Sequence, residues 1–379
     1  MPFVRPAHLF ALATCAAATV LALPALARTC TWTGAVDNLA TTAGNWACDA
    51  GSGPPAGGDD VMFPAAAAHK DTYSHNYASG LVPIFNTIDF APGYTVNGPG
   101  GLRFTHSLYA TGPLTVNTLI DGQHTGTLAI REAASTSDVV YMQGYVRFMS
   151  PVAGITVGTS GAANTARLIL NGTLPGSPDR VTVYQGGRLS FATSNASEVS
   201  VLTVRQGGTL AVSDPPPGVP PAILGNATVT QALDLQSGST FEYLVHADGF
   251  SSGGVIIGAG ATANLSGATL KVVLGDPGAP EPVGTEHRIL EYPSGTTLGS
   301  TFASLPEGAT VEASNAPGVF YRITYGAAGT ETVQLNRVAA PPRPSEPGAA
   351  VPVPTLGSMG LALLALLAGA MGLRARRRG

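Results

Sequence analysis

The amino-acid sequence predicts an all-β chain, folded as a right-handed parallel β-helix (a β-solenoid) with a cap at each end. Composition is the first indication: 48 glycines, 30 prolines and only 11% charged residues in 379 favour many short strands joined by tight turns. The second is a strand–corner–strand motif that recurs along the middle of the chain. A period of about 20 residues with occasional insertions is typical of solenoids. The alternative is a β-sandwich or jelly roll, whose hairpins can occur at similar spacing.

Residues 1–27 have the three parts of a secretory signal peptide. Arg5 supplies the positive charge at the start, and an uncharged apolar run follows it. Ala25 and Ala27 are the small residues of a cleavage site that ends just before Arg28. We therefore expect the chain to be exported and to begin at Arg28 after cleavage.

Residues 28–93 are expected to cap the start of the solenoid. Cys30 and Cys48 remain after signal removal, and an even pair of cysteines in an exported chain predicts a disulfide. Closing a loop of this length is worth about 3 kcal/mol in the chain-entropy model. Trp32 and Trp46 lie near this pair and can cover the unpaired strand edges at the open end. The alternative is that their rings contact a glycan, as exposed Trp rings stack on the faces of sugars.

The solenoid itself is expected over residues 94–266, where a motif of strand, Gln or Asn, glycine and strand repeats. Alternation at period two places Val183 and Leu189, or Val204 and Leu210, on one face. Glycine turns the corner because it adopts positive φ without steric cost. The copies span residues 94–104, 181–191, 202–212 and 233–243, with weaker copies at 155–158 and 168–174.

The copies are separated by steps of different length. The corner recurs after 21 residues from Gln185 to Gln206, and after 30 residues from Gln206 to Gln236. The longer step contains the proline-rich segment 214–221, which cannot lie within a central strand. We therefore expect insertions to leave the solenoid between strands, and Asn and Gln side chains to form ladders from coil to coil.

Beyond the solenoid, residues 267–338 have the pattern of longer strands and are expected to form the second cap that a solenoid requires. Residues 339–354 are a Pro-rich spacer. Residues 355–379 contain an uncharged, mostly apolar run at 356–373, followed by arginines. A helix of this length spans about 27 Å, close to the hydrocarbon thickness of a bilayer. One transmembrane helix with its arginines on the cytoplasmic side is therefore expected.

The end of the chain resembles the IPTL-CTERM sorting signal, a relative of the PEP-CTERM signals that exosortase-type enzymes process in Gram-negative bacteria. The resemblance rests on Val353, Pro354, Thr355, Leu356 and Gly360, then the apolar run, then Arg374, Arg376, Arg377 and Arg378. It implies insertion into the inner membrane, processing by an exosortase- or archaeosortase-like enzyme, and delivery of the membrane-anchored intermediate to the cell surface or the extracellular space. The alternative is an ordinary single-pass anchor that is never cleaved.

Two further segments resemble autotransporter-like β-solenoid surface proteins. Trp32-Thr33-Gly34, Asn45-Trp46 and Asp59-Asp60 with the apolar strand after them are similar to the opening segment of those proteins. The run GSTFASLPEGA at 299–309 and the strand FYRITY resemble their closing strands. The resemblance implies an autotransporter-like solenoid displayed at the cell surface.

Catalytic and metal-binding patterns are weak in this sequence. The histidines form no HExxH motif, and neither a GxSxG motif nor a phosphate-binding loop is present. The acidic residues that could serve a polysaccharide lyase or hydrolase are scattered, namely Asp121, Glu132, Asp138 and Asp179. We therefore expect a protein that is not an enzyme and has no cofactor. Asp59 and Asp60 could supply only half of a calcium site, because calcium needs six or more oxygen ligands.

The charge balance excludes one class of partner. Residues 28–373 contain 14 basic and 23 acidic residues, a net charge of −9, whereas a nucleic-acid binder needs excess positive charge. The function that fits is an exported bacterial protein of the cell surface or extracellular matrix, with a structural or adhesive role and an extracellular polysaccharide as a candidate partner. The alternatives are a carbohydrate-binding surface module and, less favoured, a β-helix enzyme that degrades polysaccharides.

Overall fold

The computed structural model describes residues 27–341 apart from several loops, together with residues 363 and 365–368. The loops outside the description are residues 79, 136, 149–153, 162–164, 172–179, 192–196, 213–225, 247–252, 294–297 and 327–330. The chain divides into two units, residues 1–337 and 338–379. The described residues of the first unit form strands and two short 3-10 helices, η1 (Ala43–Asn45) and η2 (Lys70–Thr72), so the predicted all-β class is confirmed.

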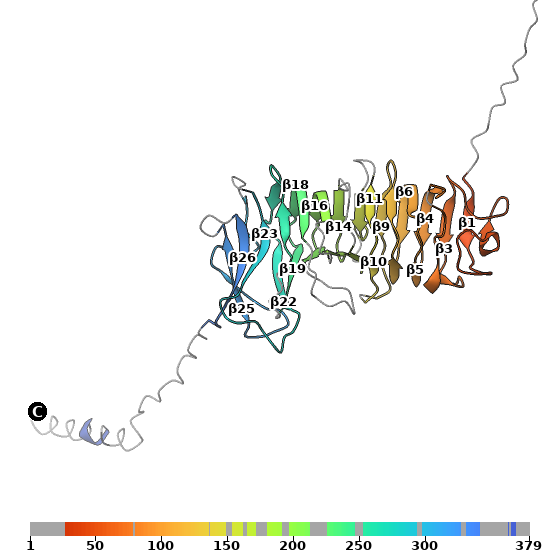
Figure 1. Ribbon diagram of the computed structural model, residues 1–379. Helices are drawn as coiled ribbons and strands as arrows, with labels where there is room; N and C mark the ends of the chain where they lie inside the picture. The colour runs from red at the N-terminus through yellow and green to blue at the C-terminus, as the bar shows by residue number, and fades with distance from the viewer. Residues whose placement is uncertain are drawn as a thin grey trace, which may run out of the picture. The chain divides into compact units, whose positions relative to one another are not determined.

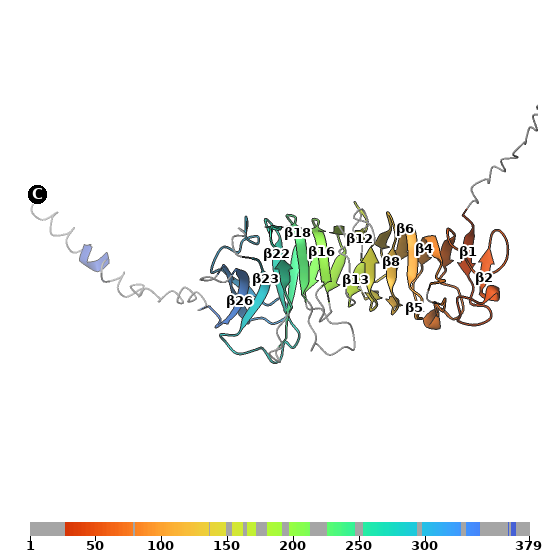
Figure 2. The same cartoon turned by 45° about the horizontal axis from the view of Figure 1, so that its top comes forward.

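The strands of the first unit belong to two sheets (Figures 1 and 2). The eight-stranded sheet contains β5 (Tyr94–Val96), β7 (Leu114–Val116), β10 (Val140–Met142), β13 (Arg167–Leu170), β15 (Arg188–Phe191), β17 (Thr209–Val212), β19 (Thr240–Val245) and β22 (Thr269–Leu274). The larger sheet begins with β1 (Thr29–Trp32), β2 (Trp46–Cys48), β3 (Asp60–Phe63), β4 (Ile84–Phe90), β6 (Leu102–Ala110), β8 (Ile120–Gly122), β9 (Thr127–Ile130), β11 (Val146–Phe148) and β12 (Gly154–Val157). It continues with β14 (Arg180–Val183), β16 (Ser197–Val204), β18 (Ala227–Leu235), β20 (Val255–Ile257), β21 (Thr262–Asn264), β23 (Glu286–Glu291), β24 (Thr310–Glu312), β25 (Phe320–Tyr325) and β26 (Thr332–Val338).

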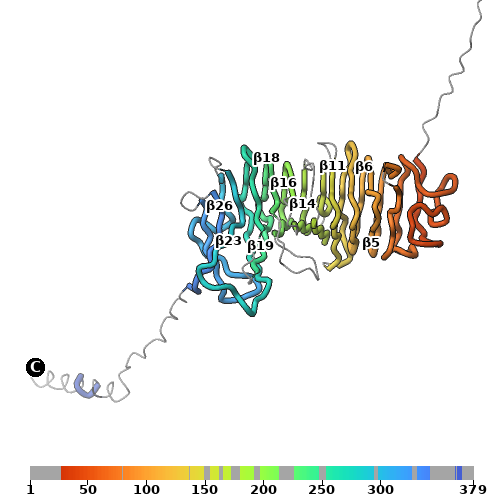
Figure 3. Tube along the Cα trace, in the orientation of Figure 1, coloured from red at the N-terminus to blue at the C-terminus, as the bar shows by residue number. Residues whose placement is uncertain are grey.

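Parallel pairing joins each coil to the next. In the smaller sheet the strands pair in the order β5, β7, β10, β13, β15, β17, β19, β22, every pair parallel. The larger sheet holds two parallel ladders, because the first part of β6 pairs with β8 and its second part with β9. Figure 3 shows the coils following one another along the stack. Three ladders per coil are compatible with the predicted β-helix and differ from the antiparallel pairing of a β-sandwich.

The register between coils places equivalent residues of the repeats above one another. Val183 pairs with Val204, and Leu189 pairs with Leu210; all four side chains are buried. The alternation in the sequence therefore identifies the inward-facing positions of these coils. The corner between them is a ladder of glycines, in which the N–H of Gly186 donates to the carbonyl of Gly207 at 2.8 Å. The next two corners, at Gly238 and Gly267, continue this ladder.

Two details of the predicted repeat are corrected by the register. Leu202 pairs with Leu233, so the step between these coils is 31 residues rather than 30. Gln236 therefore lies opposite Arg205. The residue opposite Gln206 is Ser237. The copy at residues 94–104 also turns a different corner, because it runs from the smaller sheet into the larger one, whereas the copy at 181–191 runs the opposite way. A ladder between asparagines does form, with Asn117 donating to Asn97 at 2.7 Å.

The start of the stack is closed by a disulfide and a cluster of aromatic rings. Cys30 and Cys48 are bonded, as predicted, and they lie opposite each other on the antiparallel pair β1–β2. The rings of Trp32 and Trp46 lie 5.1 Å apart, and both pack against Phe63. Trp32 is 0% exposed and Trp46 8%, so neither ring has an open face for the predicted alternative of a glycan contact. Parallel stacking already begins at β1–β3, within the segment predicted as the cap.

The other end is closed by a change of pairing. β23 is parallel to β20, but the next strand beside it, β26, is antiparallel. The outer edge of β22 is covered by a loop, in which Ser314 donates its N–H to Val272 O at 2.8 Å. The side-chain amide of Asn315 pairs with both backbone groups of Leu274, at 2.7 and 2.8 Å. Backbone groups that would otherwise form an open strand edge are thus satisfied within the chain.

Much of the predicted targeting apparatus lies outside the described residues. This holds for the signal peptide up to residue 26, for most of the Pro-rich spacer and for the sorting motif with its arginines. Within the described part of the chain, no helix is long and apolar enough to cross a membrane. At the predicted cleavage site, Arg28 is described, and its guanidinium pairs with Asp59 at 2.7 Å.

Removing the disulfide tests the cap. The double variant Cys30→Ser/Cys48→Ser is expected to lose about 3 kcal/mol of unfolding free energy, because the 18-residue separation no longer restrains the unfolded chain. Denaturant titration measures the loss. Reduction of the wild-type chain should reproduce it and leave the variant unchanged. Equal stability of oxidised wild type and variant would contradict the prediction.

Two glycines with similar backbone angles test the close packing at the corner. Gly207 has φ +73° and a Cβ there would lie 2.8 Å from Gln185 Cγ, whereas Gly260 has φ +79° and nothing within 4 Å. Gly260→Ala should cost about 1–2 kcal/mol for the left-handed backbone alone. Gly207→Ala should cost up to about 1 kcal/mol more, because the side chain of Gln185 must leave its position to make room. Equal losses of stability in thermal or denaturant unfolding would show that the Gln185 side chain does not pack tightly over this corner.

Candidate functional site

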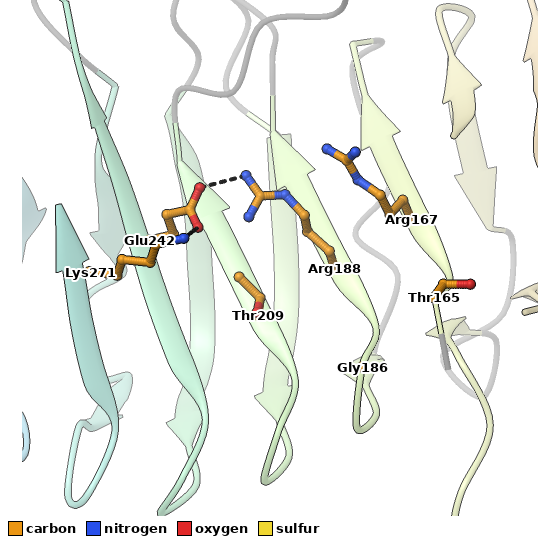
Figure 4. A pocket seen from close by; sticks show the side chains of 7 residues that line it. All are labelled: Thr165, Arg167, Gly186, Arg188, Thr209, Glu242 and Lys271. Atoms are coloured by element: carbon orange, nitrogen blue, oxygen red, sulfur yellow. Dashed lines mark hydrogen bonds and ion pairs between the residues drawn. The ribbon is translucent and has the colours of Figure 1, made fainter. Parts of the chain in front are cut away.

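The candidate site is a shallow pocket of about 400 Å³ on the outer surface of the eight-stranded sheet. Figure 4 shows the side chains that line it, which come from neighbouring coils: Thr165, Arg167, Gly186, Arg188, Thr209, Glu242 and Lys271. We call it the basic pocket, because its lining holds three cations and one carboxylate.

The parallel register brings these side chains together. Arg167 pairs with Arg188, and Arg188 pairs with Thr209, so these three residues form one row across β13, β15 and β17. The row continues to Thr240 on β19, which pairs with Thr209. Glu242 lies two positions farther along β19 and pairs with Lys271 on β22. The neighbouring residues Leu168, Leu189 and Leu210 are buried in the core, and alternation therefore directs the charged side chains outward.

An ion triad occupies part of the basic pocket. Glu242 accepts a hydrogen bond from Arg188 Nη2 at 2.8 Å and another from Lys271 Nζ at 3.0 Å. The Glu242 side chain is 12% exposed, and that of Lys271 is 45% exposed. Burial by itself raises the pKa of Glu242, but the hydrogen bonds and charges of Arg188 and Lys271 outweigh it and hold the pKa below its usual value. Glu242 is thus ionised at neutral pH and pairs with both cations.

This arrangement favours binding over catalysis. Arginine and lysine donate charge-assisted hydrogen bonds to carboxylate, sulfate or phosphate groups, and threonine hydroxyls can bond to polar ligands. An ionised carboxylate held between two cations is a poor general acid at neutral pH. The basic pocket therefore presents hydrogen-bond donors at the surface of the sheet and no general acid.

The acidic residues considered from the sequence do not converge. Asp121 is 1% exposed and lies between Arg103 (3.3 Å) and Arg147 (2.6 Å), its register partners on the adjacent coils. Asp138 accepts a hydrogen bond from the N–H of Ser135 within a turn. Glu132 is exposed, and Asp179 lies outside the described residues.

The acidic pair at the N-terminal cap is also engaged. The carboxylate of Asp59 accepts hydrogen bonds from Arg28 Nε and from the N–H of Ala56, both at 2.7 Å. Asp60 accepts one from the side chain of Asn86 at 2.8 Å. Among the described residues, no group of three or more His, Cys, Asp or Glu is placed to hold a metal ion.

The sequence did not indicate a buried pair in the C-terminal strands. His287 Nε2 lies 2.7 Å from Glu281 Oε1, and both side chains are buried. The pKa of the neighbouring Tyr321 is raised, first by burial and then by the charge of Glu281. The alternation of β23, in which His287 faces inward, was the one signal that could have identified it. The pair belongs to the packed interior of the end cap.

Comparison with known proteins identifies one segment. Residues 351–378 match the model of the IPTL-CTERM motif, which covers the predicted sorting residues. The match suggests an exported chain and is consistent with surface association. No curated protein and no solved structure matches the chain, so the resemblance to autotransporter-like solenoids stays a prediction.

Replacing Glu242 tests the ion triad. Glu242→Gln should lower the unfolding free energy at pH 7 by about 1–2 kcal/mol, because two partly buried cations lose their counter-ion. Since the pKa of Glu242 is lowered in the folded chain, the contribution is complete above the ordinary pKa of this group, 4.5, and is lost as pH falls through the lowered pKa of the folded chain. Unfolding of both chains at several pH values measures it. A difference that does not shrink as pH falls below 4.5 would contradict the electrostatic origin.

Proposed function

We propose that this chain is an exported bacterial protein of the cell surface or extracellular matrix, with a structural or adhesive role and no enzymatic activity. The observation that carries the proposal is the match of residues 351–378 to the IPTL-CTERM motif. In this proposal, the C-terminal helix inserts into the inner membrane, a sortase-like enzyme of the exosortase or archaeosortase type processes the tail, and the chain is released toward the cell surface.

The architecture supports a structural or adhesive role. A right-handed parallel β-helix with closed ends is a stiff body that offers long, regular outer faces to a matrix. The disulfide Cys30–Cys48 suits an oxidising compartment outside the cytoplasm. Charged side chains on the outer faces form ladders between coils, as in Arg103–Asp121–Arg147, and such ladders stabilise the stack.

A carbohydrate-binding surface module is the second candidate, and the basic pocket is the observation that favours it. A polysaccharide-degrading enzyme is less favoured. Such enzymes place two or three carboxylates a few ångströms apart, whereas Asp121 is enclosed by two arginines and Asp138 is held in a turn.

Processing of the tail can be followed in the native host. Intact mass and cell fractionation should find a species that begins at Arg28 and ends near Thr355, located at the surface or in the medium. A variant that lacks residues 351–379 should never enter the inner-membrane fraction. A variant that lacks only spacer residues 342–348 is the control and should be processed like the wild type. A wild-type species that stays in the inner membrane and retains Arg374–Arg378 would contradict processing and show that the tail is an uncleaved membrane anchor.

A further inference from the structure

We propose that a second pocket, on the outer surface of the N-terminal coils, binds one uncharged sugar ring, with the ion pair Arg131–Asp89 as its polar edge. The pocket has a volume of about 240 Å³. We call it the Arg131 pocket, and the lining residues that bear on binding are Met62, Pro64, Asp89, Pro92, Thr111 and Arg131. The inference deepens the second candidate function, a carbohydrate-binding surface module, and rests on the proposed export only for the setting.

Arg131 reaches across two coils to form the polar edge. Backbone pairing places Asp89, Tyr109 and Ala129 in one outward row on β4, β6 and β9. Arg131 follows β9, and its guanidinium lies 3.9 Å from the centre of the Tyr109 ring. Its Nη1 donates to both carboxylate oxygens of Asp89, each at 3.0 Å. The ring and the carboxylate together fix the orientation of the guanidinium plane.

The ion pair leaves hydrogen-bonding groups for a ligand. The Arg131 side chain is 40% exposed, and its Nε and Nη2 groups have no partner in the described part of the chain. Each oxygen of Asp89 accepts one bond from Arg131 and has a lone pair for another. A sugar hydroxyl both donates and accepts. Adjacent hydroxyls of one ring can therefore donate to Asp89 and accept from Arg131.

The charges at this edge favour a neutral ligand. The lining of the Arg131 pocket contains one guanidinium and one carboxylate, and these two groups are paired with each other. An anionic group would lie beside the carboxylate of Asp89, and a cationic group would lie beside the guanidinium of Arg131. A neutral ligand that carries both donors and acceptors can bond to both side chains without separating the pair.

The rest of the Arg131 pocket offers apolar surface. Met62, which is 45% exposed, lines it together with Pro64 and Pro92. Below them lie the buried rings of Phe63 and Phe90, stacked with their centroids 4.2 Å apart. A sugar ring has apolar C–H groups on its faces and hydroxyls at its edge, so it matches a site with an apolar wall and a few polar groups. The volume is below the range of about 300–1,000 Å³ that drug-sized ligands occupy, and it suits a single ring.

The walls of the pocket are held in place by the stack itself. Tyr94 donates its hydroxyl to the carbonyl of Pro64 at 2.7 Å. Thr111 donates its backbone N–H to the carbonyl of Phe90 on the preceding coil at 3.2 Å. The ring of Pro92 fixes its own φ. A site that is formed before the ligand arrives loses little conformational entropy on binding.

Saturation-transfer NMR with the processed chain purified from its host tests the inference. The probes are the methyl glycosides of glucose, galactose, mannose and N-acetylglucosamine, all uncharged. Methyl galacturonoside is the matched comparison, because it is the galactoside with one carboxylate. At least one neutral glycoside should bind, and more tightly than the galacturonoside. Added salt should leave its affinity unchanged, because no net charge is neutralised on binding.

Two variants assign the binding to the Arg131 pocket. Arg131→Ala should weaken it by about tenfold, which corresponds to the loss of one hydrogen bond to a charged group. Ala91→Leu leaves the ion pair in place and adds bulk to the lining, and it should weaken binding by about tenfold or more. Arg103→Ala is the control, because it removes an arginine from an ion pair with Asp121, outside this pocket. It should bind like the wild type, and thermal unfolding verifies the fold of each variant.

Three results overturn the inference: none of the neutral glycosides binds, the galacturonoside binds more tightly than all of them, or either folded pocket variant binds as tightly as the wild type. None of these results bears on the processing of the tail, so the proposed export is tested separately.

Discussion

The backbone register between neighbouring coils is the constraint on which the rest of this structure depends. Parallel strands pair through their backbones, and a slip of one residue would turn every inward side chain toward solvent. Val183 must therefore lie beside Val157 and Val204, whatever happens between the strands. This explains how steps of 21 and 31 residues coexist: after the longer connection, the next strand returns to the same register.

A stack of coils joined by backbone pairing has two ends, and each end is closed by a different kind of interaction. At the start, short β2 turns antiparallel beside β1, and the disulfide and buried rings hold it there. At the finish, Asn315 offers the amide of its side chain to β22 in place of another strand. Both solutions satisfy or hide backbone groups that would otherwise pair with a second chain.

The same register builds the basic pocket. Side chains at one outward position recur at intervals of about 4.8 Å, so a row of charges on the surface needs only one suitable residue per coil. Where opposite charges alternate, as in Arg103–Asp121–Arg147, the row stabilises the stack. Around Glu242, the same pairing brings the side chains of Arg188 and Lys271 onto one carboxylate. Both ion triads thus come from the same geometry of the stacked coils.

The sequence by itself determined the all-β class, the Cys30–Cys48 pair and the contiguous motif at residues 351–378, because alternation, glycine corners and short motifs are local. It also placed Val204 and Leu210 on the inward face. Only the tertiary structure decided where Gln236 lies, that both tryptophans are buried, and which charges meet. Arg188 and Glu242 are 54 residues apart, and the insertions between them have lengths that no periodicity reveals. Their contact exists because backbone pairing, and not residue count, sets the register between coils.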